Sequence, residues 1–226
     1  MPLACHPPLR LISSNQRRVL FSCAVASPEF QGRDTEDINS ELEHILQRIY
    51  GGSPGVDLSA LCIVENAQVW VIYVDVLVLE TGGNLLDHIG IAVKAALGDT
   101  RIPKVTVLEN SEEGRRGGAE LEVSDDPYDS VPLIPTDGED TVPLCITLSR
   151  VGTRTIADAS QEEEAVMSSQ LSVGVSPGGN PAGIQKRGLG AVEPAVMIEM
   201  IELAARIGPK IHTQLQLLLR GGEGDD

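Results

Sequence analysis

Four carboxylates stand close together in the second half of the chain, in the stretch IADASQEEEAVMSSQLSVGV at 156–175. They are Asp158, Glu162, Glu163 and Glu164. Acidic side chains at this density can transfer protons, hold a divalent cation, or keep a surface turn in contact with water. Charge runs are most often solvated surface, so the residues alone favour an acidic turn between two strands.

Two chemical alternatives stay open on the residues alone. A magnesium or calcium site is the weaker one, because QEEE contains neither an EF-hand pattern nor an aspartate pair. Acid catalysis at a strand end is the other, with Asp158 near Glu164 as proton donor or metal anchor. The four cysteines and four histidines form no C-x-x-C, H-x-H or H-E-x-x-H motif. We therefore expect no metal, no cofactor and no disulfide framework, and a reduced intracellular compartment.

The charge balance limits the classes of partner. The 226 residues include 33 acidic and 17 basic side chains, a formal net charge of −16. A protein that binds nucleic acid alone usually presents a basic patch, so autonomous RNA or DNA binding is disfavoured. A few arginines can still contribute to a site shared with a more basic partner. His44 and His88 are expected on helices as packing or surface residues.

The most apolar run, at 69–79, is too short to cross a membrane and carries Asp75 in its middle. Its valine-rich composition predicts a strand buried on both faces. We expect Asp75 to be a buried aspartate that accepts backbone N–H groups. The first residues make a poor signal peptide, since prolines interrupt their apolar part.

In the first half, strands and helices alternate. Strands are expected at 20–25, at 60–80 as a hairpin that turns near 65–67, and at 104–109. A helix begins at Asp34 or Thr35, carries an apolar stripe and ends at Gly51. A second helix, 85–97, is capped by Asn84 and closed by Gly98.

The second half shows a similar order of strands and a helix. It follows a connector rich in glycine, proline and acidic residues, which we expect to contain one strand or hairpin. Strands follow at 144–160, 165–177 and 183–188. A last helix runs from Glu193 to Leu219, and Pro209 inside it should kink or break it. Helices laid on sheets in two similar halves predict an α+β fold.

Five separated segments resemble the RNase PH family, and within it a ring subunit of the eukaryotic RNA exosome. They are SPEFQGRD, WVIYVDVLVLETGGNLLDHIGIAVKAAL, TRIPKV, SDDPYD and IADASQEEEAVMSSQLSV. Several motifs in the right order, over about 20–219, are more specific than one short pattern. The resemblance implies an RNase PH-like fold, similar to ribosomal protein S5 domain 2, with two βαβα halves. The family's first strands, which carry a D-G-R motif, have no counterpart here, so an exposed sheet edge is expected.

On this resemblance the chain divides into five parts. They are an atypical N-terminal segment at 1–19, a truncated first RNase PH domain at 20–108, a connector at 109–140, a second RNase PH domain at 141–219 and a disordered tail at 220–226.

Active members of the family cleave the 3′ end of RNA with inorganic phosphate, and the resemblance indicates which of their groups remain. Their Gly-Gly-Thr/Ser-Arg run falls on Gly82, Gly83, Asn84 and Leu85. The glycines and the helix start persist, whereas leucine cannot compensate the charge of a phosphate.

The family's two aspartates, six residues apart, are the other missing pair. With Asp158 and the acids after it aligned, the aspartates fall on Glu164 and Gln170. A glutamine neither ionises nor transfers a proton. Losing both the arginine and one acid predicts a vestigial site in a non-catalytic subunit. An active phosphate-dependent exoribonuclease, an RNA-binding adaptor outside the exosome and a nonfunctional truncated isoform are the alternatives.

The resemblance also implies the partners. They are other RNase PH-like subunits in a hexameric ring, S1/KH cap subunits and RNA in the central channel, with no membrane. Nucleus, nucleolus and cytoplasm are the implied locations. Arg33 and Arg154 are the candidates for the RNA path.

Overall fold

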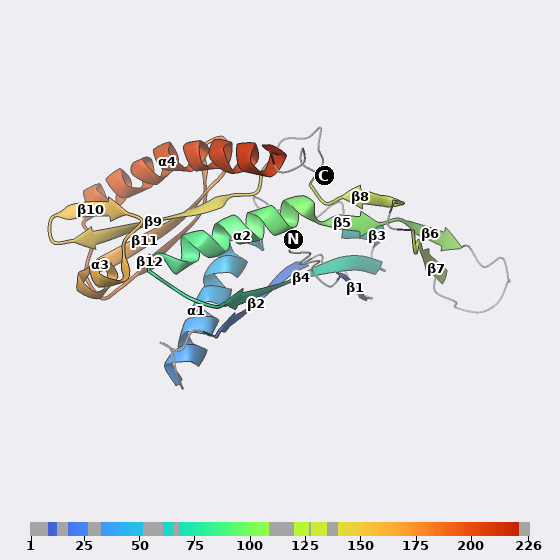
Figure 1. The fold of residues 1–226 in the computed structure, drawn as a ribbon, viewed down its shortest axis with the longest axis horizontal. Helices are drawn as coiled ribbons and strands as arrows, with labels where there is room; N and C mark the ends of the chain where they lie inside the picture. The colour runs from blue at the N-terminus through green and yellow to red at the C-terminus, as the bar shows by residue number, and fades with distance from the viewer. Residues whose placement is uncertain are drawn as a thin grey trace.

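The computed structural model describes two β-sheets, four helices and a projecting arm (Figure 1). The described residues are 9–12, 18–26, 33–51, 61–65, 68–108, 120–126, 128–134 and 140–221. In Figure 1 the layers from top to bottom are α4 (Pro194–Gly221), the C-terminal sheet, α2 (Leu85–Asp99) and the N-terminal sheet. No helix among these residues is long and apolar enough to cross a membrane.

The N-terminal sheet is built around one long strand. Its members are β1 (Leu9–Ile12), β2 (Arg18–Val25), β3 (Cys62–Val64) and β4 (Gln68–Val78). Strand β4 pairs in parallel with β2 and antiparallel with β1 and β3, which confirms the hairpin expected at 60–80. Asp75 is exposed, not buried, because the second half of β4 turns one face to solvent. Leu77 on that face is 63% exposed.

Helix α1 (Arg33–Tyr50) joins the two sheets and confirms the predicted apolar stripe. Leu42, Ile45, Leu46 and Ile49 are buried in one core with β2, β4 and α2. The helix also contacts β12 (Pro181–Arg187) of the C-terminal sheet, where Ile49 lies against Gly183. The helix ends at Tyr50, as its glycine stop predicts.

Side chains of α1 also cover the outer edge of β2. The backbone N–H of Cys23 donates to Glu43 Oε1 at 3.0 Å, and that of Val25 donates to Asn39 Oδ1 at 3.1 Å. Buried or half-buried backbone donors need such partners. Two outward donors of the expected open edge are therefore satisfied from within the chain.

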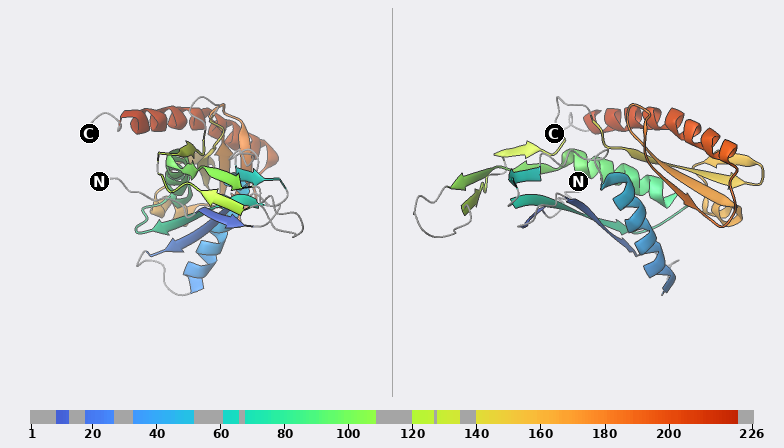
Figure 2. Two further views of the ribbon diagram at one scale, coloured as in Figure 1. Left: turned by 90° about the vertical axis from the view of Figure 1, so that its right-hand side faces the viewer. Right: turned by 180° about the vertical axis from the view of Figure 1, so that it is seen from behind.

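The connector at 109–140 contributes two short strands, which pair with strands that precede it and not with each other as a hairpin. The four strands are β5 (Arg101–Pro103), β6 (Val105–Leu108), which confirms the strand expected at 104–109, β7 (Glu120–Val123) and β8 (Ser130–Pro132). β6 pairs with β7 and β5 with β8. They form an arm that extends away from the sheets in Figure 1 and in the right-hand view of Figure 2.

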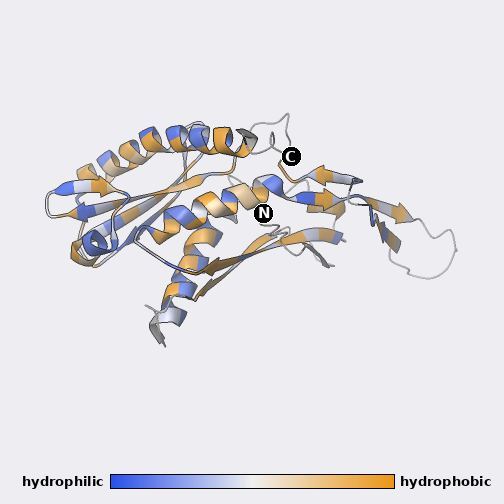
Figure 3. Ribbon diagram, in the orientation of Figure 1, coloured by the Kyte–Doolittle hydropathy of each residue, from blue (hydrophilic) through white to orange (hydrophobic). Residues whose placement is uncertain are grey.

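The C-terminal sheet has one apolar and one polar face. Its other strands are β9 (Leu144–Val151), β10 (Arg154–Ala157) and β11 (Ser169–Val175), and the order β10-β9-β11-β12 is antiparallel throughout. Alternate residues such as Leu148, Leu171 and Val173 pack against α4. On the opposite face Thr147, Ser149, Gln170 and Ser172 are buried and polar. In Figure 3, β4 and β9 are largely hydrophobic and α3 (Gln161–Val166) hydrophilic.

Helix α4 continues through Pro209, so the expected break is wrong. Packing holds the helix on both sides of the proline: Met200 and Ala204 are buried before it, and His212 after it. Tertiary burial of this kind outweighs a local helix penalty of about 3 kcal/mol. The helix ends at Gly221, and the remainder of the expected tail lies outside the described residues.

Candidate functional site

The loop before α2 meets the acidic stretch through two glycines. Gly83 has φ 113°, and a side chain there would place its Cβ 2.5 Å from the carbonyl oxygen of Ala159. Only glycine tolerates both the backbone angle and the approach. The backbone N–H of Gln161 then donates to the carbonyl of Gly82 at 3.2 Å. The glycine loop at 82–83 and the acidic stretch that begins at Asp158 are therefore in direct contact.

Asn84 links the two motifs but does not cap the helix as predicted. Its backbone is left-handed (φ 46°), and its side chain makes no capping hydrogen bond. Instead Nδ2 donates to Asp87 Oδ2 and to Asp158 Oδ1, both at 3.0 Å. Its backbone N–H donates to Glu164 Oε1 at 3.2 Å. One asparagine thus gathers three carboxylates around the start of α2.

The acidic turn is partly helical. Residues 161–166 form α3, whose first turn is closed by a capping box between Ser160 and Glu163. The expected strand at 165–177 is therefore shorter, 169–175. The S-x-x-E pattern was present in the sequence, but a six-residue helix gives too weak a periodicity to be recognised.

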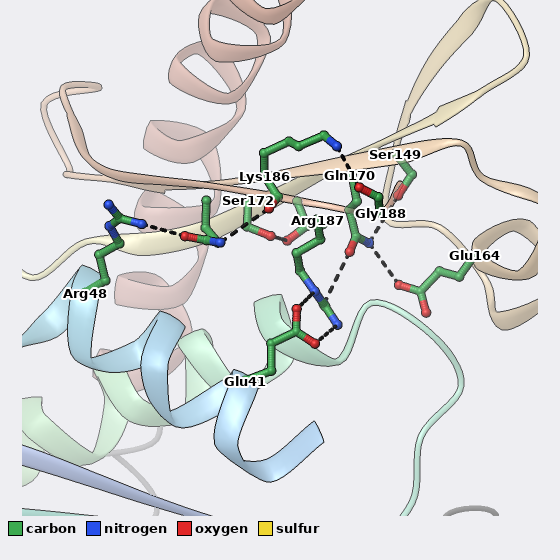
Figure 4. A network of polar contacts seen from close by, with 11 residues as sticks. Glu41, Arg48, Ser149, Glu164, Gln170, Ser172, Lys186, Arg187 and Gly188 are labelled. Atoms are coloured by element: carbon green, nitrogen blue, oxygen red, sulfur yellow. Dashed lines mark hydrogen bonds and ion pairs between the residues drawn. The ribbon is translucent and has the colours of Figure 1, made fainter. Parts of the chain in front are cut away.

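Gln170 sits at the centre of a network that joins both halves (Figure 4). It is 2% exposed. Its Nε2 donates to Glu164 Oε1 at 3.1 Å and to Ser149 Oγ at 3.2 Å, while its Oε1 accepts from Arg187 Nη1 at 3.3 Å. A carboxylate at 170 could accept from Arg187 but could not donate to Glu164. The amide satisfies both neighbours.

Arg187 is a member of this site that sequence reasoning missed. Its Nε and Nη2 donate to the two carboxylate oxygens of Glu41 on α1, at 2.8 and 3.2 Å. This fork-shaped pairing is favoured by the planar guanidinium. The signal that could have found it is the strand register, in which Gln170 lies directly opposite Arg187.

A hollow of about 480 Å³ opens in front of the glycine loop, and we call it the outer hollow. Its lining residues are Glu80, Thr81, Gly82, Gly83, Leu85, His88, Asp158, Ala159 and Ser160. No lysine or arginine is among them. Leu85 and Asp158 therefore share one hollow, whereas Gln170 and its partner Glu164 are not among its lining residues. Phosphate would meet two carboxylates, a leucine and a histidine here, with no lysine or arginine to balance its charge.

Asp87 is the most perturbed carboxylate at the site, and it too was missed. Burial raises its pKa to about 6, while hydrogen bonds from Thr147 and Asn84 act in the opposite direction. Thr147 Oγ1 donates to Asp87 Oδ1 at 2.6 Å, and Thr147 N–H donates to Oδ2 at 2.8 Å. These bonds fix α2 to the polar face of the C-terminal sheet.

The remaining candidates lie apart from this cluster or outside the description. Arg154 is exposed at the far end of β10, four residues of extended strand from Asp158, which is about 13 Å. Arg33 is the first residue of α1, and its side chain is outside the described residues. His44 and His88 are exposed on helices. The RNA-path roles of the two arginines stay predictions.

Comparisons with known proteins agree with this architecture. The models of the 3′ exoribonuclease family match in both parts, domain 1 over 14–103 and domain 2 over 141–207. A Dictyostelium discoideum protein, provisionally named exosome complex exonuclease RRP42, is 32% identical over 88% of this chain and 72% of that protein. The exosome complex component Rrp42 of Thermococcus kodakarensis is 34% identical over 84% of this chain and 65% of its own length.

Solved structures support the fold. A chain of the Archaeoglobus fulgidus exosome with RNA bound to its active site superposes with a TM-score of 0.67 at 24% identity, over 91% of this chain and 76% of that one. A chain of an archaeal exosome core gives 0.65 at 22% identity, over 92% and 75%. The RNase PH-like fold expected from the sequence is thereby confirmed. With both domain models matched in order and a relative 32% identical over most of its length, the chain belongs to the 3′ exoribonuclease (RNase PH) family.

Proposed function

We propose that this chain is a structural subunit of the RNA exosome ring, of the Rrp42 type, that supports 3′-to-5′ RNA processing and degradation without cleaving RNA itself. Relatives named exosome components, which the chain matches over most of its length, support the assignment to the complex. The observation that carries the lack of catalysis is Gln170, a buried amide where an ionisable group would be required.

The chemistry of phosphorolysis explains why this substitution matters. Inorganic phosphate must approach a phosphodiester of like charge, which requires cations and donors positioned for the developing charge. Leu85 contributes neither, and the described residues that line the outer hollow include no lysine or arginine. Loss of one such group commonly lowers the rate by about 10²–10³-fold. Loss of the cation and of a carboxylate together leaves no expected turnover.

A phosphorolysis assay tests this proposal. The purified chain is incubated with single-stranded RNA, inorganic phosphate and magnesium, and the release of nucleoside diphosphates is measured beside a catalytically competent RNase PH protein as positive control. We expect release at the level of the buffer blank. Phosphate-dependent release that rises with the amount of chain would overturn the non-catalytic assignment but not the family.

An active phosphorolytic exoribonuclease is the second candidate. The name of the Dictyostelium relative favours it, and so does Arg187, a guanidinium 3.3 Å from Gln170. Its engagement with Glu41 argues against a free phosphate clamp. In the same assay, phosphorolysis that Arg187→Ala abolishes would favour this candidate. The double variant Leu85→Arg with Gln170→Asp should gain activity only if the defect of the wild type lies at those two positions.

The partners follow from the same proposal. We propose RNase PH-like neighbours in a hexameric ring, S1/KH cap subunits on one face and RNA in the channel. Nucleus, nucleolus and cytoplasm are the proposed locations. The acidic composition, net −16, supports a role in which RNA contacts are shared with more basic subunits.

A further inference from the structure

A groove of about 530 Å³ lies between α1 and β12, and we call it the α1–β12 groove. Its lining residues are Glu41, His44, Ile45, Gln47, Arg48 and Gln185. None of them lines the outer hollow, so the groove is separate from the glycine loop. Two polar contacts join α1 to β12 here, Glu41 with Arg187 and Arg48 with Gln185 (Figure 4). A volume of this size is typical of pockets that bind small molecules.

The acidic side chain of the groove has a counter-charge within the chain, whereas its arginine has none. Both carboxylate oxygens of Glu41 accept hydrogen bonds from Arg187, at 2.8 and 3.2 Å. Arg48 Nη1 donates to Gln185 Oε1 at 2.7 Å, and that amide oxygen is neutral. Among the described residues, no carboxylate forms an ion pair with Arg48. The groove therefore presents an uncompensated positive charge on a chain of net charge −16.

Gln185 holds the Arg48 guanidinium in one orientation. Gln185 is itself held, because its Nε2 donates to the backbone carbonyl of Lys186 at 3.3 Å. With Nη1 of Arg48 engaged, the donors on Nε and Nη2 have no partner among the described residues. These two nitrogens form the fork with which arginine binds an oxyanion. A donor that is already oriented loses less conformational freedom when the ligand binds.

The other walls of the groove are polar. His44 lies one helical turn before Arg48 and lines the same groove, so both side chains lie on one face of α1. Gln47 adds an amide. Ile45 is only 2% exposed, so an apolar ligand would gain little contact area. The α1–β12 groove is thus suited to a polar anion.

A phosphate group fits this arrangement better than a carboxylate does. The oxygens of a phosphate point in several directions, so a guanidinium fork and an imidazole N–H can donate to it together, whereas the two oxygens of a carboxylate lie in one plane. Arginine and polar side chains of this kind hold nucleic-acid backbones. We propose that the α1–β12 groove binds a phosphate group, with Arg48 as its main contact and His44 as a second donor. The phosphate belongs to an RNA strand or to a free nucleotide.

Titration of the isolated full chain with uridine 5′-monophosphate tests this inference. Isothermal titration calorimetry and NMR of the backbone amides and arginine Nε–H groups are recorded at about pH 8 in Tris buffer of low ionic strength, where the phosphate is doubly charged. Uridine is the neutral match, and glutarate is a dicarboxylate of equal charge. We expect saturable binding of the nucleotide with shifts at Arg48 and Gln185, and weaker binding of glutarate. Uridine should bind about tenfold or more weakly, since it lacks the charged group.

Variants of exposed residues separate the groove from general electrostatic attraction. Arg48→Gln should weaken nucleotide binding about tenfold or more, because a charge-assisted pair is lost. Arg48→Lys keeps the charge without the fork and should give an intermediate affinity, and His44→Ala should have a smaller effect than Arg48→Gln. Arg206→Gln on α4 removes an exposed charge outside the groove and should leave the affinity unchanged.

Several outcomes would overturn the proposal. They are the absence of saturable binding, equal binding of uridine or glutarate, and equal affinities of Arg48→Gln and Arg206→Gln. Urea denaturation of each variant shows whether a loss of binding reflects a loss of fold. If Arg48→Gln does not fold, the comparison of Arg48→Lys with Arg206→Gln decides.

A short oligouridylate with a 5′-hydroxyl end identifies the source of the phosphate, since it presents phosphodiesters alone. Binding of this strand that is tighter than that of the mononucleotide, and that Arg48→Gln weakens, supports RNA as the source. Binding of the mononucleotide alone supports a free nucleotide. Phosphate binding at the α1–β12 groove requires neither the exosome ring nor the lack of catalysis, so a negative result leaves the proposed function untouched.

Discussion

At Gln170, the amide nitrogen of the side chain decides which hydrogen bonds the site can make. Its Nε2 donates to Glu164, and Glu164 in turn accepts from the backbone N–H of Asn84. An aspartate at 170 would face Glu164 as a like charge, which raises the pKa of one of the two. The amide at 170 instead takes part in hydrogen bonds that link β11, α3 and the start of α2.

Gly83 is a sterically restricted residue of the loop before α2, and its substitution should change the free energy of unfolding. Gly83→Ala should lower the free energy of unfolding by about 1–3 kcal/mol, because alanine is strained at φ 113° and its Cβ would collide with the carbonyl of Ala159. Gly82→Ala is the matched control, since its added Cβ meets no atom within 4 Å. Urea denaturation of both variants measures the difference. Equal stability of the two would contradict the close approach of the loops.

Residues that act over long sequence distances could not be predicted from the chain alone. Asp158 and Glu164 were singled out from the acidic run itself, whereas Gln170 was named only because a family resemblance supplied its spacing. Arg187 was missed because its importance lies in strand register and in a partner, Glu41, 146 residues away. A single arginine on a short strand gives no local signal.

Among the elements, length and periodicity decided what the sequence could predict. Helix α1 and the hairpin of β3 and β4 carry long apolar patterns, and both were predicted correctly. Strands β1 and β5 span four and three residues, too few for a pattern, and were missed, whereas β6 was predicted within 104–109. Gly98 was expected to end α2, but the helix continues to Asp99 and Thr100 follows it as the C-cap.

Docking of α4 depends on a buried histidine. His212 is 2% exposed, and its Nε2 contacts the carbonyl of Val175 at 2.8 Å, while Nδ1 has no partner among the described residues. Burial lowers its pKa; Lys94 on α2 acts in the same direction, and the Val175 carbonyl and Asp140 of the connector act against it. The neutral imidazole is therefore the form that fits between α4, β11 and α2.

The sign of the resulting pH dependence follows from this lowered pKa. In the unfolded chain the imidazole of His212 takes up a proton near pH 6.5, whereas in the folded chain it does so only at a lower pH. The free energy of unfolding that this group contributes is therefore fully present above pH 6.5 and falls as the pH drops below it. His212→Gln should remove this loss between pH 7.5 and 5.5 in urea denaturation. His44→Gln, which changes an exposed histidine, should follow the wild type. Parallel curves for wild type and His212→Gln would exclude His212 as the origin.

At the scale of the whole molecule, the two halves are joined by polar contacts as well as by a core. Arg187 pairs with Glu41, Thr147 holds Asp87, and buried Lys94 pairs with Asp140 at 2.6 Å. Lys94 is almost fully enclosed, so breaking that pair would leave an uncompensated charge. The Arg187 pair is partly exposed and contributes less. The relative orientation of the halves is thus specified at several separate points.

Association with a ring is the prediction that belongs to this scale. A tagged full chain, purified from cells and treated with ribonuclease to remove RNA bridges, should co-purify RNase PH-like and S1/KH-type chains, identified by mass spectrometry. The tag alone is the control for adhesion. A folded, soluble chain that retains none of these proteins would refute the proposed place in the exosome, while leaving the family assignment intact.

Helix α1, whose side chains cover the outer edge of β2, should affect the solubility of the chain. Glu43 and Asn39 already occupy the N–H groups of Cys23 and Val25, which a foreign strand would need for pairing. An approaching strand must first displace those two side chains, and thereby leave a carboxylate and an amide without their donors. Fibre-like growth of the sheet at this margin is accordingly opposed by α1, much as an added strand would oppose it.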